Sequence, residues 1–209
     1  MSTPNAAFYF DLASPLAYLA AERVLHTLPA PAEWQPVLAS ELPGGETFEG
    51  FRCREDEEIF RVEVERRARE LGLQPLRWPE PFPFDSALAM RVATYAKSIG
   101  RAVPFAQAAF RQVFAGGRAL EEADNVLIAA AACEMHPKAV LTGASLRSVD
   151  LQLSEVTASA ARVGVMDVPA VVVSPAQPGE GPPQVFHGER SLEEAAAHMR
   201  ASARATATQ

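Results

Sequence analysis

A serine followed by a proline lies between a short apolar run and an amphipathic segment near the start of the chain. The run Ala6–Asp11 (AAFYFD) is rich in aromatic residues and is typical of a buried strand, and Leu16 and Leu19 share one face of a helix. Ser14 is a preferred N-cap residue, and Pro15 is a preferred first helical residue. The pattern predicts a strand, a tight turn and a helix that begins at Ser14-Pro15.

Ser14 is the residue of this unit with the clearest chemical potential. A strand that enters a helix through Ser-Pro directs a hydroxyl and free backbone N–H groups into the space above the helix N-terminus. Such a place stabilises an anion or a thiolate, because the N–H groups and the helix dipole both favour negative charge. A serine here is equally explained as a cap that satisfies a backbone N–H group. The spacing leaves both interpretations open.

Pro169 is the second residue whose position suggests a functional role. It stands between Val168 and the apolar run Ala170–Val173, and proline is disfavoured inside a central strand, so we expect it to start a strand or occupy a tight turn. A cis bond before Pro169 would leave the backbone of Val168 free to pair with a peptide-like ligand. The residues alone do not decide the isomer, since most X–Pro bonds are trans.

Other sequence features disfavour several classes of site. The histidines lack a metal-ligand spacing, and the paired glycines fit neither a P-loop nor a dinucleotide motif. Cys53 and Cys133 form neither a C-x-x-C motif nor a disulfide framework, so both are expected to be reduced and structural. The net charge of -7 disfavours nucleic acid as a partner.

The chain also lacks the patterns of an exported or membrane-bound protein. Its first residues (MSTPNAAFYFDLASP) have no basic opening segment, and the longest apolar run, Val126–Cys133, is too short to cross a bilayer. We therefore expect a cytoplasmic protein that has no membrane partner.

The order of predicted elements indicates the fold class. The β-α-β opening ends at a second strand around Val37-Leu38, and helical periodicity then replaces strand-like runs for roughly a hundred residues. Within this segment Phe60, Val64, Ala68 and Leu71 form one apolar stripe, and Gly72 ends the helix.

Strand character returns at Val168–Val173 and Gln184–Phe186, and Ser191 can cap a last helix. This order is that of an α/β protein, a thioredoxin fold with an inserted all-helical domain. We assign residues 1–40 and 164–209 to a discontinuous thioredoxin-like domain and residues 41–163 to the helical insertion.

Several segments resemble those of the 2-hydroxychromene-2-carboxylate isomerases and kappa-class glutathione transferases, which belong to the DsbA-like thioredoxin superfamily. They are Phe8–Ala20 (FYFDLASPLAYLA), Arg66–Leu73 (RRARELGL), Pro81–Asp85 (PFPFD), Gly164–Ala170 (GVMDVPA) and Phe186–Gly188 (FHG). The resemblance spans nearly the whole chain and implies a thioredoxin fold. With the β-branched context it also predicts a cis bond before Pro169.

The resemblance implies that glutathione is the cofactor. In this family glutathione lies against the backbone before the cis-proline, here Val168-Pro169, and a serine at the position of Ser14 hydrogen-bonds the glutathione sulfur. A thiol of pKa about 8.5 is mostly protonated at neutral pH, so a hydroxyl donor and a helix N-terminus would raise the thiolate fraction. In the isomerase that thiolate adds to an unsaturated carbon of the chromene, permits bond rotation and is then expelled.

The same resemblance suggests how the γ-glutamyl end would be held. The family has an acidic residue beside an arginine after the glycine that matches Gly188, whereas here the segment reads Gly-Glu-Arg-Ser. Glu189 is therefore expected, with a one-position shift, to bind the γ-glutamyl ammonium. Arg190 would then face the carboxylate of the same group or solvent.

We accordingly predict an enzyme, a glutathione-dependent isomerase or transferase that acts on a small aromatic electrophile, and a homodimer is compatible with this prediction. Two alternatives stay open. One is a non-redox thioredoxin-like binding protein that has lost glutathione. The other is a DsbA-family thiol-disulfide oxidoreductase, which is disfavoured because neither cysteine lies in the turn that contains Ser14.

Overall fold

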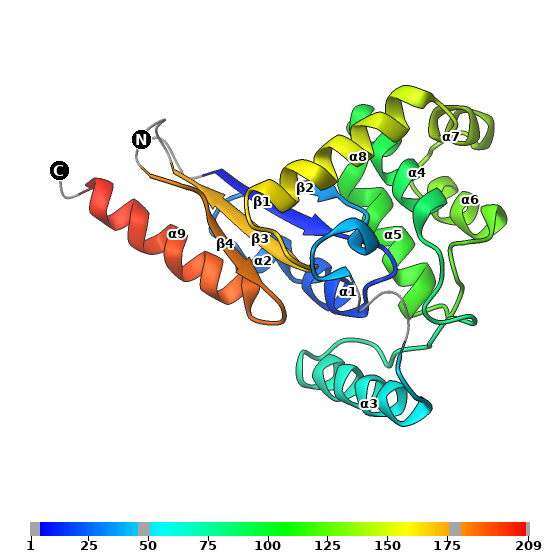
Figure 1. The fold of residues 1–209 in the computed structure, drawn as a ribbon, viewed down its shortest axis with the longest axis horizontal. Helices are drawn as coiled ribbons and strands as arrows, with labels where there is room; N and C mark the ends of the chain where they lie inside the picture. The colour runs from blue at the N-terminus through cyan, green and yellow to red at the C-terminus, as the bar shows by residue number, and fades with distance from the viewer. Residues whose placement is uncertain (1–4, 46–50, 176–180, 208–209) are drawn as a thin grey trace.

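A computed structural model describes residues 5–45, 51–175 and 181–207. Its strands form one mixed sheet in the order β2-β1-β3-β4, in which β1 and β2 are parallel and the other pairs are antiparallel (Figure 1). The strands are β1 (Asn5–Phe10), β2 (Ala32–Pro36), β3 (Ala170–Ser174) and β4 (Gln184–His187). The central strand β1 feeds directly into the turn that contains Ser14.

The helices are α1 (Pro15–Ala21), α2 (Val24–Thr27), the short 3-10 helix η1 (Ala39–Glu41), α3 (Arg54–Glu70), α4 (Ala87–Ser98), α5 (Ala102–Phe114), α6 (Ala123–Ala131), α7 (Pro137–Ala144), α8 (Arg147–Arg162) and α9 (Ser191–Ala207). Helices α1, α2 and α9 accompany the strands, and η1 and α3 to α8 lie between β2 and β3 in the chain. This order confirms the predicted thioredoxin fold with a helical insertion. No helix in the described part of the chain has both the length and the apolar character that crossing a bilayer requires.

The two faces of the sheet are buried against different helices. Phe8 and Phe10 point to one face, where they contact Trp34 with ring centroids 5.0 Å and 5.7 Å away, and Phe10 also meets Phe110 of α5. Val172, on the other face, packs in a smaller cluster with the end of α8. The alternation of side chains along β1 and β3 therefore places the sheet between two helical layers.

The second strand differs from the prediction. It was expected around Val37-Leu38, but β2 ends at Pro36, and only the N–H group of Val37 continues the ladder by donating to the carbonyl of Phe10 at 3.1 Å. β2 is an edge strand, and an edge position tolerates a proline that would interrupt a central strand. The chain then turns into η1.

Helix α3 lies at the bottom of the view in Figure 1, apart from α4 to α8, which gather at the right and upper right. Only Val64 and Ala68 of its residues are fully buried, and Phe60 and Leu71 are packed against the same core. Its predicted apolar stripe is confirmed, as is its end at Gly72, which has a φ of 68°. The long connector from α3 to α4 contains cis bonds before Pro81 and Pro83.

Candidate functional site

The hydroxyl of Ser14 lies at the buried N-terminus of α1. Its Oγ accepts a hydrogen bond from the N–H of Ala17 at 3.1 Å, and Pro15 is the first helical residue, as the sequence predicts. The same Oγ lies 3.5 Å from the carbonyl oxygen of Val168, to which it donates. Ser14 is only 2% exposed. The residue is therefore a helix cap, and it also faces the segment that precedes Pro169.

The Val168–Pro169 bond is cis, as predicted. The backbone of Val168 is not free, however, which differs from the expectation. Its N–H donates to Oδ1 of Asp167 at 2.6 Å, and its carbonyl receives the long hydrogen bond from Ser14. The cause is local, because the carboxylate of Asp167 lies next to the N–H of the following residue. A ligand that pairs with Val168 must displace this carboxylate.

Asp167 is a site residue that the sequence analysis did not single out. Burial raises the pKa of its carboxyl, although the hydrogen bond from Val168 and the nearby His187 oppose the rise. His187 takes part in the same corner, since its Nε2 accepts from the N–H of Met166 at 3.0 Å. An acidic residue immediately before a Val-Pro pair is the only sequence signal for this arrangement.

Aromatic side chains close the space above Ser14. Phe51, Phe60 and Phe82 line its pocket, with ring centroids 5.4 Å apart for Phe51 and Phe60 and 6.1 Å apart for Phe51 and Phe82. Asp167 and Val168 complete the wall, and the pocket holds about 40 Å³. Sequence reasoning missed these aromatic residues as site residues, because Phe51 precedes α3, Phe60 lies on it and Phe82 lies on the connector that follows it.

A larger cavity of about 700 Å³ adjoins two of these aromatic residues, Phe51 and Phe82. It shares Phe51, Phe82 and Pro83 with the pocket of Ser14. Arg54 and Arg61 line it, and the guanidinium of Arg61 lies 4.9 Å from the ring centroid of Trp78 and 5.5 Å from that of Phe82. This cavity is open to solvent.

The turn before Ser14 is held by a buried carboxylate. Asp11 accepts hydrogen bonds from the N–H groups of Ala13 and Ala39, both at 2.9 Å. Burial raises the pKa of Asp11, although these two N–H groups and the Ser86 hydroxyl favour its charged form. Asp11 therefore fixes the end of β1 to η1 and sets the position of Ser14, a role that its place in an apolar run did not reveal.

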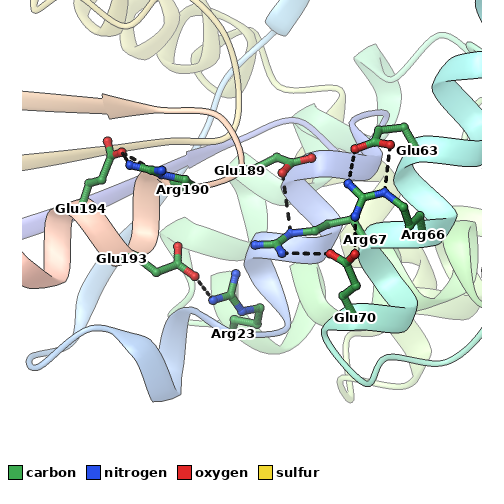
Figure 2. Close-up of polar contacts among 9 residues, drawn as sticks. All are labelled: Arg23, Glu63, Arg66, Arg67, Glu70, Glu189, Arg190, Glu193 and Glu194. Carbon is green, nitrogen blue, oxygen red and sulfur yellow. Dashed lines mark hydrogen bonds and ion pairs between the residues drawn. The ribbon is translucent and has the colours of Figure 1, made fainter.

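Glu189 and Arg190, predicted to bind the γ-glutamyl end of glutathione, point to different partners (Figure 2). Oε2 of Glu189 lies 3.6 Å from Nε of Arg67 on α3, and Arg190 pairs with Glu194 at 3.0 Å. Neither lines the pocket that contains Ser14. Their role toward glutathione stays a prediction.

The two cysteines lie in different environments. Cys53 is exposed at the start of α3, and Cys133 is buried near the end of α6, where burial raises the pKa of its thiol. Neither is in the turn of Ser14, and no disulfide joins them. Among the described residues, no group of three or more histidine, cysteine or acidic side chains could hold a metal ion.

The sheet topology, the helix that begins at Ser14 and the facing cis-proline define the class: a thioredoxin-fold protein with a helical insertion. The chain belongs to the DSBA-like thioredoxin domain family, whose model matches residues 6–200. This result confirms the superfamily that the sequence resemblance indicated.

Solved structures share the fold at low sequence identity. A 2-hydroxychromene-2-carboxylate isomerase superposes with a TM-score of 0.77 and 18% identity, over 97% of this chain and 98% of that one. A probable DsbA oxidoreductase from Streptomyces coelicolor gives 0.70 and 17%, over 95% and 89%. The cytosolic disulfide reductase DsbM from Pseudomonas aeruginosa, in its structure with GSH, gives 0.64 and 13%, over 98% and 100%. No curated protein matches the chain.

Proposed function

We propose that the protein is a glutathione-dependent isomerase or transferase that acts on a small aromatic electrophile. The observation that carries this proposal is the buried hydroxyl of Ser14, held at the N-terminus of α1 and 3.5 Å from the carbonyl of Val168. A hydroxyl donor and a helix N-terminus together favour a thiolate over a thiol. The similarity in fold to the isomerase and to the GSH-bound reductase supports the choice of glutathione.

The residues at this corner fit both the sulfur and the peptide part of glutathione. When bound, glutathione would supply a thiolate nucleophile. Ser14 would orient the sulfur, because its hydrogen bond to Val168 is long and the hydroxyl can be redirected without losing the bond from Ala17. Val168 would pair with the peptide backbone after Asp167 turns away.

The surroundings of Ser14 also suit the proposed substrate. Phe51, Phe60 and Phe82 would pack against an aromatic electrophile and keep water from the reacting carbon. Glu189 remains the proposed contact of the γ-glutamyl ammonium, and Arg190 would face the carboxylate of the same group or solvent. Glu189 lies on the turn between β4 and α9, and binding would require it to exchange Arg67 for the ammonium.

Titration calorimetry with reduced glutathione tests the proposal most directly. We expect saturable binding by the unmodified protein and weaker binding of S-methylglutathione, in which the sulfur cannot ionise. Equal affinity for the two compounds would contradict the role of Ser14. Absence of binding to either would remove glutathione from the function.

A second candidate is a non-redox binding protein of the same fold that has lost glutathione. Specific observations favour it, because the N–H of Val168 already pairs with Asp167, Glu189 already pairs with Arg67, and the pocket at Ser14 is far smaller than the roughly 300 Å³ of ordinary ligand sites. Undetectable glutathione binding by a folded protein would favour this candidate.

A further inference from the structure

We propose that helix α3 is a lid over Ser14, that the ion pair between Arg67 and Glu189 holds it closed, and that glutathione opens it by taking Glu189 from Arg67. The lid and its latch are inferred from the contacts of α3 and do not depend on the identity of the ligand. The opening by glutathione rests on the proposed function.

The pocket above Ser14 must enlarge before any ligand reaches the hydroxyl. Its volume of about 40 Å³ accommodates little more than a water molecule. Phe60 forms part of its wall, and Phe60 belongs to α3. A displacement of α3 would withdraw this ring and enlarge the pocket.

Helix α3 has the attachments expected of a movable element. Most of its residues are partly or fully exposed, and only Val64 and Ala68 are buried. Several of its ion pairs lie within the helix itself, as those of Arg66 with Glu63 and Glu70 do. An element with few buried apolar contacts belongs to the least stable part of a fold.

One ion pair ties α3 to the turn between β4 and α9. Among the described residues, Arg67 and Glu189 form the only ion pair that joins α3 to another element of the fold, with Nε and Oε2 separated by 3.6 Å (Figure 2). The side chains are 23% and 37% exposed. Solvent therefore weakens the ion pair, and the pair can be broken and re-formed at low cost in free energy. Arg67 also contacts Glu70, which gives it a partner when the lid is open.

The proposed position of the γ-glutamyl ammonium makes ligand and latch competitors. When the carboxylate of Glu189 binds the ammonium of glutathione, it no longer forms its ion pair with Arg67 in the same geometry. Glutathione would therefore favour the open position of α3 by its differential affinity for the two states. This coupling would admit the electrophile only after the cofactor is bound.

The latch is tested by the accessibility of position 14 to a thiol reagent. Ser14→Cys in a Cys53→Ser background places a reactive thiol under the lid and removes the exposed cysteine, and Cys53→Ser alone measures the background from buried Cys133. We expect Arg67→Ala and Glu189→Gln each to accelerate labelling by iodoacetamide about two- to fivefold, as the loss of one partly exposed ion pair would in a two-state equilibrium. Arg66→Ala is the matched control, because its ion pairs stay within α3.

Unchanged labelling in Arg67→Ala and Glu189→Gln would overturn the latch, as would equal acceleration in Arg66→Ala. Calorimetry on the protein with Ser14 intact tests the coupling. Arg67→Ala should tighten glutathione binding about two- to fivefold, because the competitor for Glu189 is gone, whereas Glu189→Gln should weaken it. If labelling responds but no variant binds glutathione, the latch stands and the proposed function fails.

Hydrogen exchange gives a second measurement that needs no introduced cysteine. Amides of α3 should exchange faster in Arg67→Ala and in the unmodified protein saturated with glutathione. If the amides of α3 exchange at the same rate or more slowly when glutathione is bound, then glutathione does not open the lid, even if the latch is present.

Discussion

The hydroxyl oxygen of Ser14 lies 3.5 Å from the carbonyl oxygen of Val168, although 154 residues separate the two in the chain. The contact joins the N-terminus of α1 to the segment that leads into β3. It brings a buried donor against the segment before Pro169, and the proposed glutathione site depends on this geometry.

Ser14→Ala separates the capping role of this serine from its proposed role toward sulfur. We expect a loss of about 1 kcal/mol in the free energy of unfolding, because the N–H of Ala17 loses its acceptor. We also expect a higher pKa for the thiol of bound glutathione, measured from thiolate absorbance. Ser191→Ala is the control, since the Ser191 hydroxyl is buried at the start of α9 and has no hydrogen-bond partner among the described residues. Lower stability with an unchanged thiol pKa would leave Ser14 as a cap only.

Glu189→Gln should weaken glutathione binding by roughly ten- to a hundredfold, because a charge-assisted contact contributes about 1.5–3 kcal/mol. The fold should remain intact, since the Glu189 side chain is 37% exposed. Arg190→Gln should change the affinity much less, because Arg190 pairs with Glu194 near solvent. Glutathione affinity from calorimetry and the melting temperature, both measured on the two variants, test this prediction. A lower melting temperature with unchanged affinity would make Glu189 a structural residue.

Asp167→Ala should strengthen glutathione binding about three- to tenfold. The substitution frees the N–H of Val168, so the ligand no longer competes with a carboxylate for this donor. Glu41→Ala, which removes an acidic side chain outside the pocket of Ser14, serves as the control for net charge. Weaker binding in Asp167→Ala would show that the carboxylate itself contributes to the site.

Asp11→Asn should change the pH dependence of stability. The pKa of Asp11 is raised in the folded state, so the folded protein binds this proton more tightly than the unfolded chain. Its contribution is therefore complete below the unfolded pKa of about 3.9 and is lost as the pH rises through the raised folded value. Urea unfolding at several pH values should show this decline in the unmodified protein and not in the variant. If the free energy of unfolding changes with pH in the same way in both proteins, the prediction is contradicted.

The same variant should be less stable than the unmodified protein by about 1–3 kcal/mol near neutral pH. An amide presents one oxygen, so the N–H of either Ala13 or Ala39 loses its acceptor in a buried place. Equal stability there would show that water or another group replaces the lost oxygen.

Disulfide reductase activity should be negligible in an insulin reduction assay. The turn at α1 offers a serine, and Cys53 and Cys133 are respectively exposed on α3 and buried near α6. Activity that persists in Ser14→Ala but disappears when either cysteine is replaced would identify a dithiol mechanism that the site does not suggest.

Local sequence signals were sufficient for the core of the fold. The Ser14-Pro15 pair predicted the start of α1 because N-cap and first-turn preferences act within one helical turn. The valine run predicted β3, and the apolar stripe of α3 with Gly72 predicted that helix and its end. The family resemblance added the cis bond before Pro169.

The tertiary structure decided what surrounds Ser14. Phe60 and Phe82 line its pocket from separate segments, and Arg67 pairs with Glu189 more than a hundred positions away. Asp167 accepts the hydrogen bond of the Val168 N–H, which the sequence analysis had expected to be free. β2 likewise ended at Pro36 because its place at the sheet edge, which no local pattern reveals, makes a proline tolerable. Sequence periodicity reports which face of an element is apolar, but contacts between elements depend on how whole helices and strands pack, and that packing brings together residues that carry no mutual signal in the chain.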